Sequence, residues 1–221
     1  DHQLPMPDFI IGDVGSTIYR MEGGRWSHWQ AWEGEIAPDW GEMSRTNIET
    51  LLCHNSELRL QEPTKQNSYK LSYYFPLDLD ITAVIKRLET TLKRAGVKAS
   101  LITSIDEPAA IGLLDILPER ATKCHAIEFL MAQLGFGLDQ TIFAGDSGND
   151  IPVLISPINA ILVANADSDL CSHAQHEASL KGNGETLYCA TGGYLEMNGN
   201  YSAGILEGVA HYLPNVIEWL R

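Results

Sequence analysis

The sequence has 221 residues, and its 29 acidic against 15 basic side chains give a formal net charge of −14 at pH 7. This charge argues against nucleic-acid binding, because contacts with a phosphate backbone require a basic surface. A hydrophobic content of 44% with 20% charged residues predicts a globular protein of one large or two small domains.

The pattern of apolar residues in the N-terminal half predicts a strand followed by a small α+β module. The stretch PDFIIGDVGSTIYR, residues 7–20, contains an apolar run that delivers Asp13 into a hydroxyl-rich turn. A helix that begins at Asp80 and stops at Gly96 is indicated by apolar side chains at helical spacing. The other expected elements of this module are a helix at 39–52 and strands at 57–60, 69–75, 98–103 and 111–117. We expect mostly antiparallel pairing among these strands.

From Pro118 onward the pattern alternates between short apolar strands and helices. The expected strands are 141–144 and the run AILVAN at 160–165, and the expected helices are 120–134, 150–155 and 201–220. Such alternation is typical of a parallel sheet flanked by helices, so we expect an α/β fold here.

Targeting and cysteine patterns place the chain in the cytoplasm. No apolar run approaches the roughly 20 residues that span a bilayer, and the opening DHQLPMPD is unlike a signal peptide. The four cysteines, Cys53, Cys124, Cys171 and Cys189, are scattered without CxxC spacing. This distribution favours reduced thiols over disulfides or a zinc site. From the net charge and the lack of a long apolar run, no nucleic-acid or membrane partner is expected.

The segment TIFAGDSGND carries the strongest chemical signal. An apolar strand ends at Gly145, and Asp146, Asn149 and Asp150 follow in a tight loop that opens a helix. Ligands of open α/β sheets bind at the carboxyl ends of strands, and two carboxylates with an amide suit a hard cation such as Mg²⁺. The alternative is an ordinary Asp/Gly/Asn turn with a helix cap.

Lys123 lies 23 residues upstream of Asp146, near the start of the helix that leads to this strand. A lysine on a first helical turn, beside backbone N–H groups, can hold a phosphoryl group. Its alternative is a solvated surface lysine. The combination of Lys123 with the loop 146–150, called the acidic loop from here on, is what favours the functional interpretation.

The order of these motifs resembles the C-terminal half of the haloacid dehalogenase (HAD) superfamily of phosphatases. The stretches LPMPDFIIGDVGSTIY, QNSYKLSYYF and SAGILEGVAHYL are similar to sucrose-phosphate phosphatases in particular. The resemblance implies a HAD-like Rossmannoid α/β core with a parallel sheet, formed by 1–20 and 106–221. It also implies an inserted α+β cap domain at 21–105.

The resemblance also implies roles for individual residues. Lys123 contacts the phosphoryl group and Asp146 ligates Mg²⁺ directly, while Asp150 and Asn149 support the metal and the phosphate. In the cap, Gln66 and Lys70 match sugar-contacting positions, although a half-buried strand with Lys70 on its wet face is the alternative. One departure is Cys124, because the family has glycine after the motif lysine.

Asp13 is not expected to be the nucleophile. HAD chemistry needs two aspartates two residues apart, and the second position here is Gly15, which cannot transfer a proton. The resemblance places this segment after the nucleophile strand, which makes Asp13 a turn or cap residue. We expect the aspartate pair and the second phosphate-binding motif upstream of Asp1, in on the order of 40 residues. Residues 1–221 alone are then expected to be inactive.

Three origins of this pattern are open: a shortened piece of a working phosphatase, a domain that has lost catalysis, or recruitment of Asp13. The first is favoured, because the metal and lysine motifs persist. The leading hypothesis is a Mg²⁺-dependent sugar-phosphate phosphatase that hydrolyses sucrose 6-phosphate through an aspartyl-phosphate. The alternative is a silent sugar-phosphate-binding domain of a sucrose-phosphate synthase type protein, with the synthase as partner. A third option is a related phosphatase acting on mannosyl-phosphoglycerate or trehalose phosphate.

Overall fold

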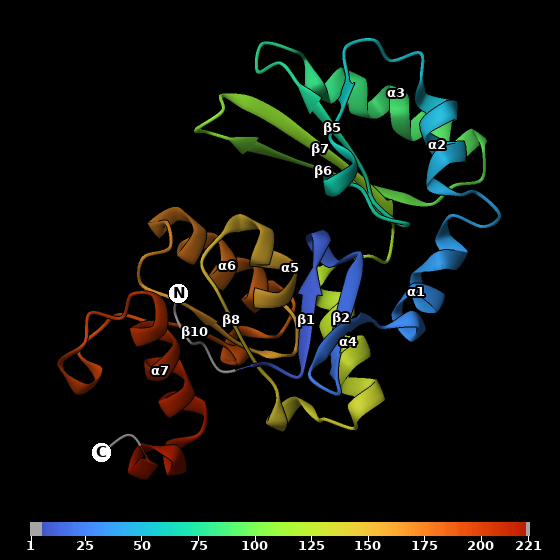
Figure 1. Ribbon diagram of the computed structural model, residues 1–221. Coiled ribbons are helices and arrows are strands. Elements are labelled where there is room, and N and C mark those ends of the chain that lie inside the picture. Colours follow the sequence, from blue (N-terminus) through green and yellow to red (C-terminus); the bar gives the residue numbers. More distant parts are fainter. Residues whose placement is uncertain (1–5, 220–221) are drawn as a thin grey trace. The chain divides into compact units, whose positions relative to one another are not determined.

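The computed structural model describes residues 6–219. Residues 1–5 and 220–221, which include the start of the predicted core segment 1–20, lie outside it. The chain divides into two compact units, Asp1–Ala126 and Ile127–Arg221. Figure 1 shows the elements of both units coloured along the sequence, and each unit is described separately below.

The first unit opens with an antiparallel sheet in the order β1-β2-β3, drawn in blue in Figure 1. Its strands are β1 (Phe9–Gly12), β2 (Thr17–Glu22) and β3 (Arg25–His28). The single strand predicted here is therefore a hairpin, with the 3-10 turn η1 (Asp13–Gly15) between β1 and β2. The helices α1 (Gln30–Ile36) and η2 (Ala37–Asp39) follow, and α1 buries Trp32 and Ile36.

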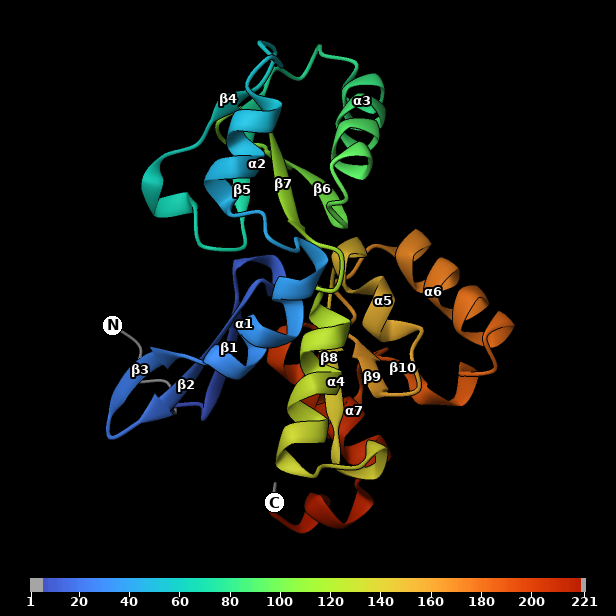
Figure 2. The same ribbon diagram turned by 90° about the vertical axis from the view of Figure 1, so that its right-hand side faces the viewer.

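The same unit contains the α+β module, whose sheet has the order β4-β5-β7-β6. All of its neighbouring strands pair antiparallel, which confirms the predicted pairing (Figure 2). Its elements are α2 (Arg45–Leu52), β4 (Arg59–Leu60), η3 (Pro63–Lys65), β5 (Leu71–Phe75), α3 (Ile81–Arg94), β6 (Ala99–Asp106) and β7 (Ile111–Pro118).

One apolar cluster joins α2 and α3 to the sheet. Helix α3 contributes Val84, Leu88 and Leu92, whose spacing of four puts them on one face. They pack with side chains of β5 and β7, of which Leu71 and Ile116 are fully buried. Apolar residues recur with a period of two along β5, so its other face is not part of this cluster.

Local capping explains where these helices begin and end. The Asp80 side chain accepts a hydrogen bond from the N–H of Ala83, and Gly96 takes a φ of 74° just beyond the helix. Helix α2 begins later than predicted, because Ser44 forms its N-terminal capping box with Asn47.

Strands β6 and β7 lie on the two sides of the predicted domain boundary at residue 106. They pair from Ala99 opposite Pro118 to Asp106 opposite Ile111. The chain therefore leaves this sheet only after β7, and the division into core and cap remains a proposal.

The second unit has a parallel sheet of order β10-β9-β8, as the alternating pattern predicts. Helix α4 (Lys123–Leu134) leads into it and ends before Gly135, which has a φ of 73°. The remaining elements are η4 (Leu138–Gln140), β8 (Ile142–Gly145), η5 (Gly148–Asp150), α5 (Ile151–Leu154), β9 (Asn159–Leu162), α6 (Ser168–Leu180), η6 (Gly184–Thr186), β10 (Leu187–Cys189), η7 (Tyr194–Glu196), α7 (Tyr201–Tyr212) and η8 (Pro214–Trp219).

Two glycines let α7 approach β9 closely. A Cβ at Gly208 would lie 2.4 Å from a side-chain carbon of Ile161, and one at Gly204 would lie 3.0 Å from Val163. The spacing of four puts both glycines on one face of the helix. The motif SAGILEGVAHY is therefore, in part, a helix-packing motif.

No helix within residues 6–219 is long and apolar enough to cross a bilayer.

Candidate functional site

The loop after β8 is organised by the carboxylate of Asp150. Its Oδ2 accepts hydrogen bonds from the backbone N–H of Asp146 at 3.1 Å and of Ser147 at 3.2 Å. The Ser147 hydroxyl donates to the same oxygen at 3.2 Å. Asp150 is 5% exposed, whereas Asp146 and Asn149 are exposed. The buried carboxylate thus folds the loop so that Asp146 follows directly at the carboxyl end of a parallel strand.

Gly145 is required by the same arrangement. A Cβ built on this residue would lie 2.6 Å from Asp150 Oδ2 and 2.8 Å from Asp150 Cγ. Contacts this short do not occur, so only glycine lets the carboxylate come so near the end of β8.

The donor set of this loop fits a hard divalent cation. It offers two carboxylates and an amide, and Mg²⁺ takes only one or two protein carboxylates and keeps several waters. Within residues 6–219 there is no group of three His, Cys, Asp or Glu side chains of the kind that forms an all-protein metal cage. The hydrogen bonds of Asp150 also stabilise the turn, as the alternative of an ordinary Asp/Gly/Asn turn predicts. One residue can both stabilise the turn and support a metal ion.

Lys123 is the first residue of α4 and is half-buried. Thr122 caps this helix, because its Oγ1 accepts the N–H of His125 at 3.1 Å. The turn between β1 and β2 packs against the same helix start, since a Cβ on Gly15 would lie 3.1 Å from the Lys123 nitrogen. Lys123 belongs to the first unit and Asp146 to the second, so their common action on a phosphoryl group stays a prediction.

Asp13 lies in the strained turn that follows β1. Asp13 and Val14 have φ values of 52° and 61°, which non-glycine residues rarely adopt. Asp13 Oδ2 accepts hydrogen bonds from Thr17 Oγ1 at 3.1 Å and from Asn67 Nδ2 at 3.2 Å. The same Asn67 nitrogen lies 2.9 Å from Ser16 Oγ. Asn67 therefore ties this turn to the segment before β5, a role that the sequence did not reveal.

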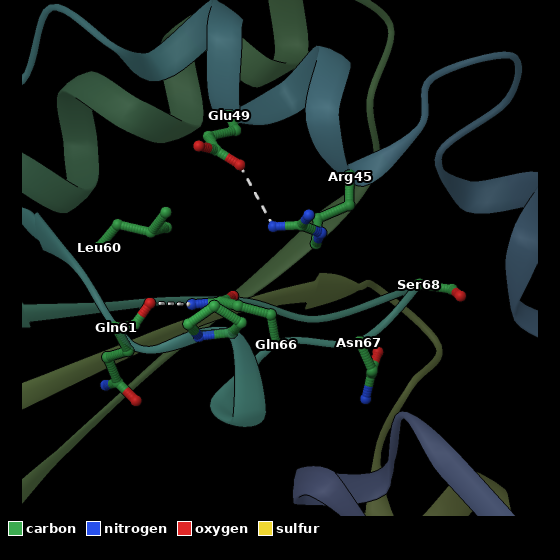
Figure 3. Close-up of a pocket in the computed structure, with 8 residues that line it drawn as sticks. Arg45, Glu49, Leu60, Gln61, Gln66, Asn67 and Ser68 are labelled. Carbon is green, nitrogen blue, oxygen red and sulfur yellow. Dashed lines mark hydrogen bonds and ion pairs between the residues drawn. The ribbon is translucent and has the colours of Figure 1, made fainter.

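Two cavities border the segment before β5. The smaller, of about 270 Å³, lies between the β1–β2 turn and this segment and is lined by Ser16, Thr17, His28, Glu33, Gln66, Asn67, Ser68 and Tyr69. The larger, of about 470 Å³, is shown in Figure 3. There Arg45 and Glu49 of α2, joined by an ion pair of 3.2 Å, face the loop that carries Gln61 and Gln66.

The Gln66 amide is engaged with the backbone. Its Nε2 donates to the carbonyl oxygens of Gln61 at 3.1 Å and Ser72 at 2.9 Å, and its Oε1 accepts the Ser72 N–H at 2.8 Å. These bonds hold the loop against β5. Gln66 lines both cavities, so its predicted sugar contact stays open.

Lys70 is 8% exposed, so the alternative that it lies on a wet strand face is wrong. Its Nζ lies 3.7 Å from Asp115 Oδ1, an oxygen that also accepts a hydrogen bond from the Ser72 hydroxyl. Asp115 stands opposite Ser72 in the β5–β7 register. The structure thus adds Asp115, which the sequence did not single out, to the surroundings of the predicted sugar-contacting residue.

A second polar cluster lies in the C-terminal unit. Glu207 of α7 is 6% exposed and accepts the backbone N–H groups of Thr191 and Gly192, each at 2.9 Å. The Tyr188 hydroxyl also donates to it at 2.9 Å. Burial opposes ionisation of Glu207, but these hydrogen bonds outweigh it and lower its pKa. The carboxylate therefore anchors the turn after β10.

Comparisons with known proteins give a consistent assignment. A family model described as sucrose-6F-phosphate phosphohydrolase matches residues 1–213. A HAD-like protein of Nitrosococcus oceani is 48% identical over all of this chain, which spans 59% of that protein. The mannosylfructose-phosphate phosphatase of Agrobacterium fabrum is 26% identical, over 95% of this chain and 74% of its own length.

A solved structure also matches. The X-ray structure of the sucrose-phosphatase of Synechocystis sp. PCC6803, in complex with sucrose and phosphate, superposes with a TM-score of 0.69. Its sequence is 28% identical, and the match covers 95% of this chain and 75% of that one.

Proposed function

The chain belongs to the sucrose-6F-phosphate phosphohydrolase family, and on this premise we propose that it is part of a sugar-phosphate phosphatase that hydrolyses sucrose 6-phosphate. The observation that carries the proposal is the Asp150-centred loop. It presents Asp146 where α/β sheets bind their ligands, at the carboxyl end of a parallel strand.

In this proposal the acidic loop and Lys123 act on the phosphate end of the substrate. Asp146 ligates Mg²⁺, with Asp150 and Asn149 in support, and the bound cation would reduce the repulsion between the phosphate and an attacking carboxylate. Lys123 supplies positive charge to the phosphoryl group, which a chain of net charge −14 must provide locally.

The attacking group of the proposal is an aspartate that becomes an aspartyl-phosphate, as the resemblance implies. Asp13 is a poor candidate, because its Oδ2 already accepts two hydrogen bonds and the residue two positions later is glycine. Reading the coding sequence in frame upstream of the Asp1 codon tests this part. An apolar strand ending in Asp-x-Asp supports it, and an aspartate-free stretch contradicts it.

The sugar end of the substrate is proposed to meet the segment before β5. Polar groups around this segment, among them Arg45, Glu49 and Asn67, have the hydrogen-bonding character that sugar hydroxyls require. Gln66 and Lys70 remain the proposed substrate contacts. The buried pair of Lys70 and Asp115 would fix the base of this region. The scattered cysteine positions, without CxxC spacing, support a cytoplasmic location for the protein.

The experiment is a phosphate-release assay on the full-length protein with a panel of sugar phosphates. We expect turnover of sucrose 6-phosphate to exceed that of mannosylfructose phosphate, trehalose 6-phosphate and mannosyl-phosphoglycerate, and to stop when Mg²⁺ is chelated. Calorimetric titration with sucrose 6-phosphate runs in parallel. Binding without phosphate release would instead support the silent module of a sucrose-phosphate synthase system.

A further inference from the structure

Two cysteines that are 18 residues apart in sequence meet in the C-terminal unit. Cys171 lies in the first turns of α6, and Cys189 is the last residue of β10. Their sulfur atoms are 2.8 Å apart, although both cysteines are free thiols. A disulfide bond measures about 2.05 Å, so the sulfurs need to approach by less than about 1 Å.

The two thiols share their surroundings. Both are half-buried and pack against the apolar cluster that contains Ala174 and Leu187. Burial raises the pKa of Cys189 to about 12, an effect that its contact with Cys171 reinforces. A hydrogen bond from the Gln175 side chain, one turn after Cys171, acts in the opposite direction. At neutral pH the Cys189 thiol is therefore protonated and unreactive by itself.

We propose that Cys171 and Cys189 are a reversible modification site, at which a small-molecule disulfide such as oxidised glutathione closes an intramolecular disulfide. The Cys171 thiolate attacks one sulfur of the reagent, whose S–S bond breaks and releases a thiolate. That thiolate takes the Cys189 proton, and the Cys189 thiolate then attacks the sulfur of Cys171 and expels the second reagent thiolate, which takes up the proton that Cys171 had lost to solvent. Two protein thiols are oxidised and one reagent disulfide is reduced to two thiols, so atoms and electrons balance.

The bond would connect α6 to a strand end that already bears a second constraint. Thr191 and Gly192, just beyond Cys189, are held by Glu207 of α7. Oxidation would therefore tie α6 to a strand end that hydrogen bonds already tie to α7. The disulfide would close the loop between residues 171 and 189, which lowers the conformational entropy of the unfolded chain. This effect predicts an increase in Tm of about 5–10 °C for the oxidised protein.

The test uses the full-length protein, incubated with oxidised glutathione or with dithiothreitol. Oxidation should remove two hydrogens from the intact mass and give a cross-linked pair of peptides that contain Cys171 and Cys189. Digestion must cut between Cys124 and Cys171, which cleavage after Glu128 achieves. Dithiothreitol should reverse both the cross-link and the Tm increase.

Variants separate this site from the other thiols. Cys171→Ser and Cys189→Ser should each lose the cross-link and the Tm increase, whereas Cys53→Ser, at an exposed position, should retain both. A stable glutathione adduct on Cys171 without the cross-link would overturn the proposal. So would a cross-link that involves Cys53 or Cys124, and peptide mapping of the wild-type protein detects either result even if a serine variant fails to fold.

Discussion

Gly145→Ala tests the proposed architecture of the acidic loop. The added methyl group would lie 2.6 Å from Asp150 Oδ2, so the carboxylate has to move. That movement weakens its three hydrogen bonds of 3.1, 3.2 and 3.2 Å. Hydrogen bonds to charged groups contribute about 1.5–3 kcal/mol each, and partial loss of three predicts a destabilisation of about 2–4 kcal/mol.

Gly148→Ala is the matched control in the same loop. No atom lies within 4 Å of its added Cβ, and the residue has no positive φ. A Gly→Ala change at a position whose backbone conformation alanine can adopt stabilises the protein by about 0.4–1 kcal/mol, because it lowers the conformational entropy of the unfolded chain. Urea unfolding of the full-length variants gives both free energies. Equal stability of the two variants would refute the loop architecture described here.

Three further predictions concern buried or half-buried polar groups, each measured by urea unfolding. Glu207→Gln should lower the free energy of unfolding by about 1–3 kcal/mol, because an amide N–H would face a backbone N–H. Since the pKa of Glu207 is lowered, the carboxylate stabilises the protein above pH 4.5, and this stabilisation disappears as the pH falls further. The variant should therefore lose less stability than the wild type as the pH falls below 4.5. Asn67→Asp should cost about 1–2 kcal/mol at pH 7 and less near pH 3, because it places a second carboxylate beside Asp13; an unchanged pH profile would contradict this. Lys70→Met should cost about 3–5 kcal/mol, because it leaves the mostly buried Asp115 carboxylate without its cation; a neutral effect would show that the pair is exposed in solution.

Elements with a strong local signal could be predicted from the sequence. Helix α3 has an Asp80 cap, a regular apolar face and a terminal Gly96, and these signals agree with one another. Helix α1 could not be predicted, because its stretch mixes tryptophan and glycine without a clear period, and burial of Trp32 is what fixes it. Strand β10 has only three residues and depends on its neighbour β9.

The same distinction applies to the candidate site. Asp146, Asn149 and Asp150 are contiguous, so the sequence alone could place them in one loop. The burial of Lys70 depends on the pairing of β5 with β7, which places Asp115 opposite Ser72 and 3.7 Å from Lys70. The Cys171–Cys189 contact likewise arises from the packing of α6 on the sheet, which sequence spacing does not encode.

The central claim is tested most directly by phosphate release from sucrose 6-phosphate in the full-length Asp146→Ala variant, assayed with Mg²⁺ beside the wild-type protein. Asp169→Ala serves as the control, because it removes another exposed carboxylate, from α6, without touching the acidic loop. The proposed function predicts that turnover is abolished in Asp146→Ala, with unchanged Tm, and retained in Asp169→Ala. Unchanged phosphate release in the Asp146 variant would contradict it.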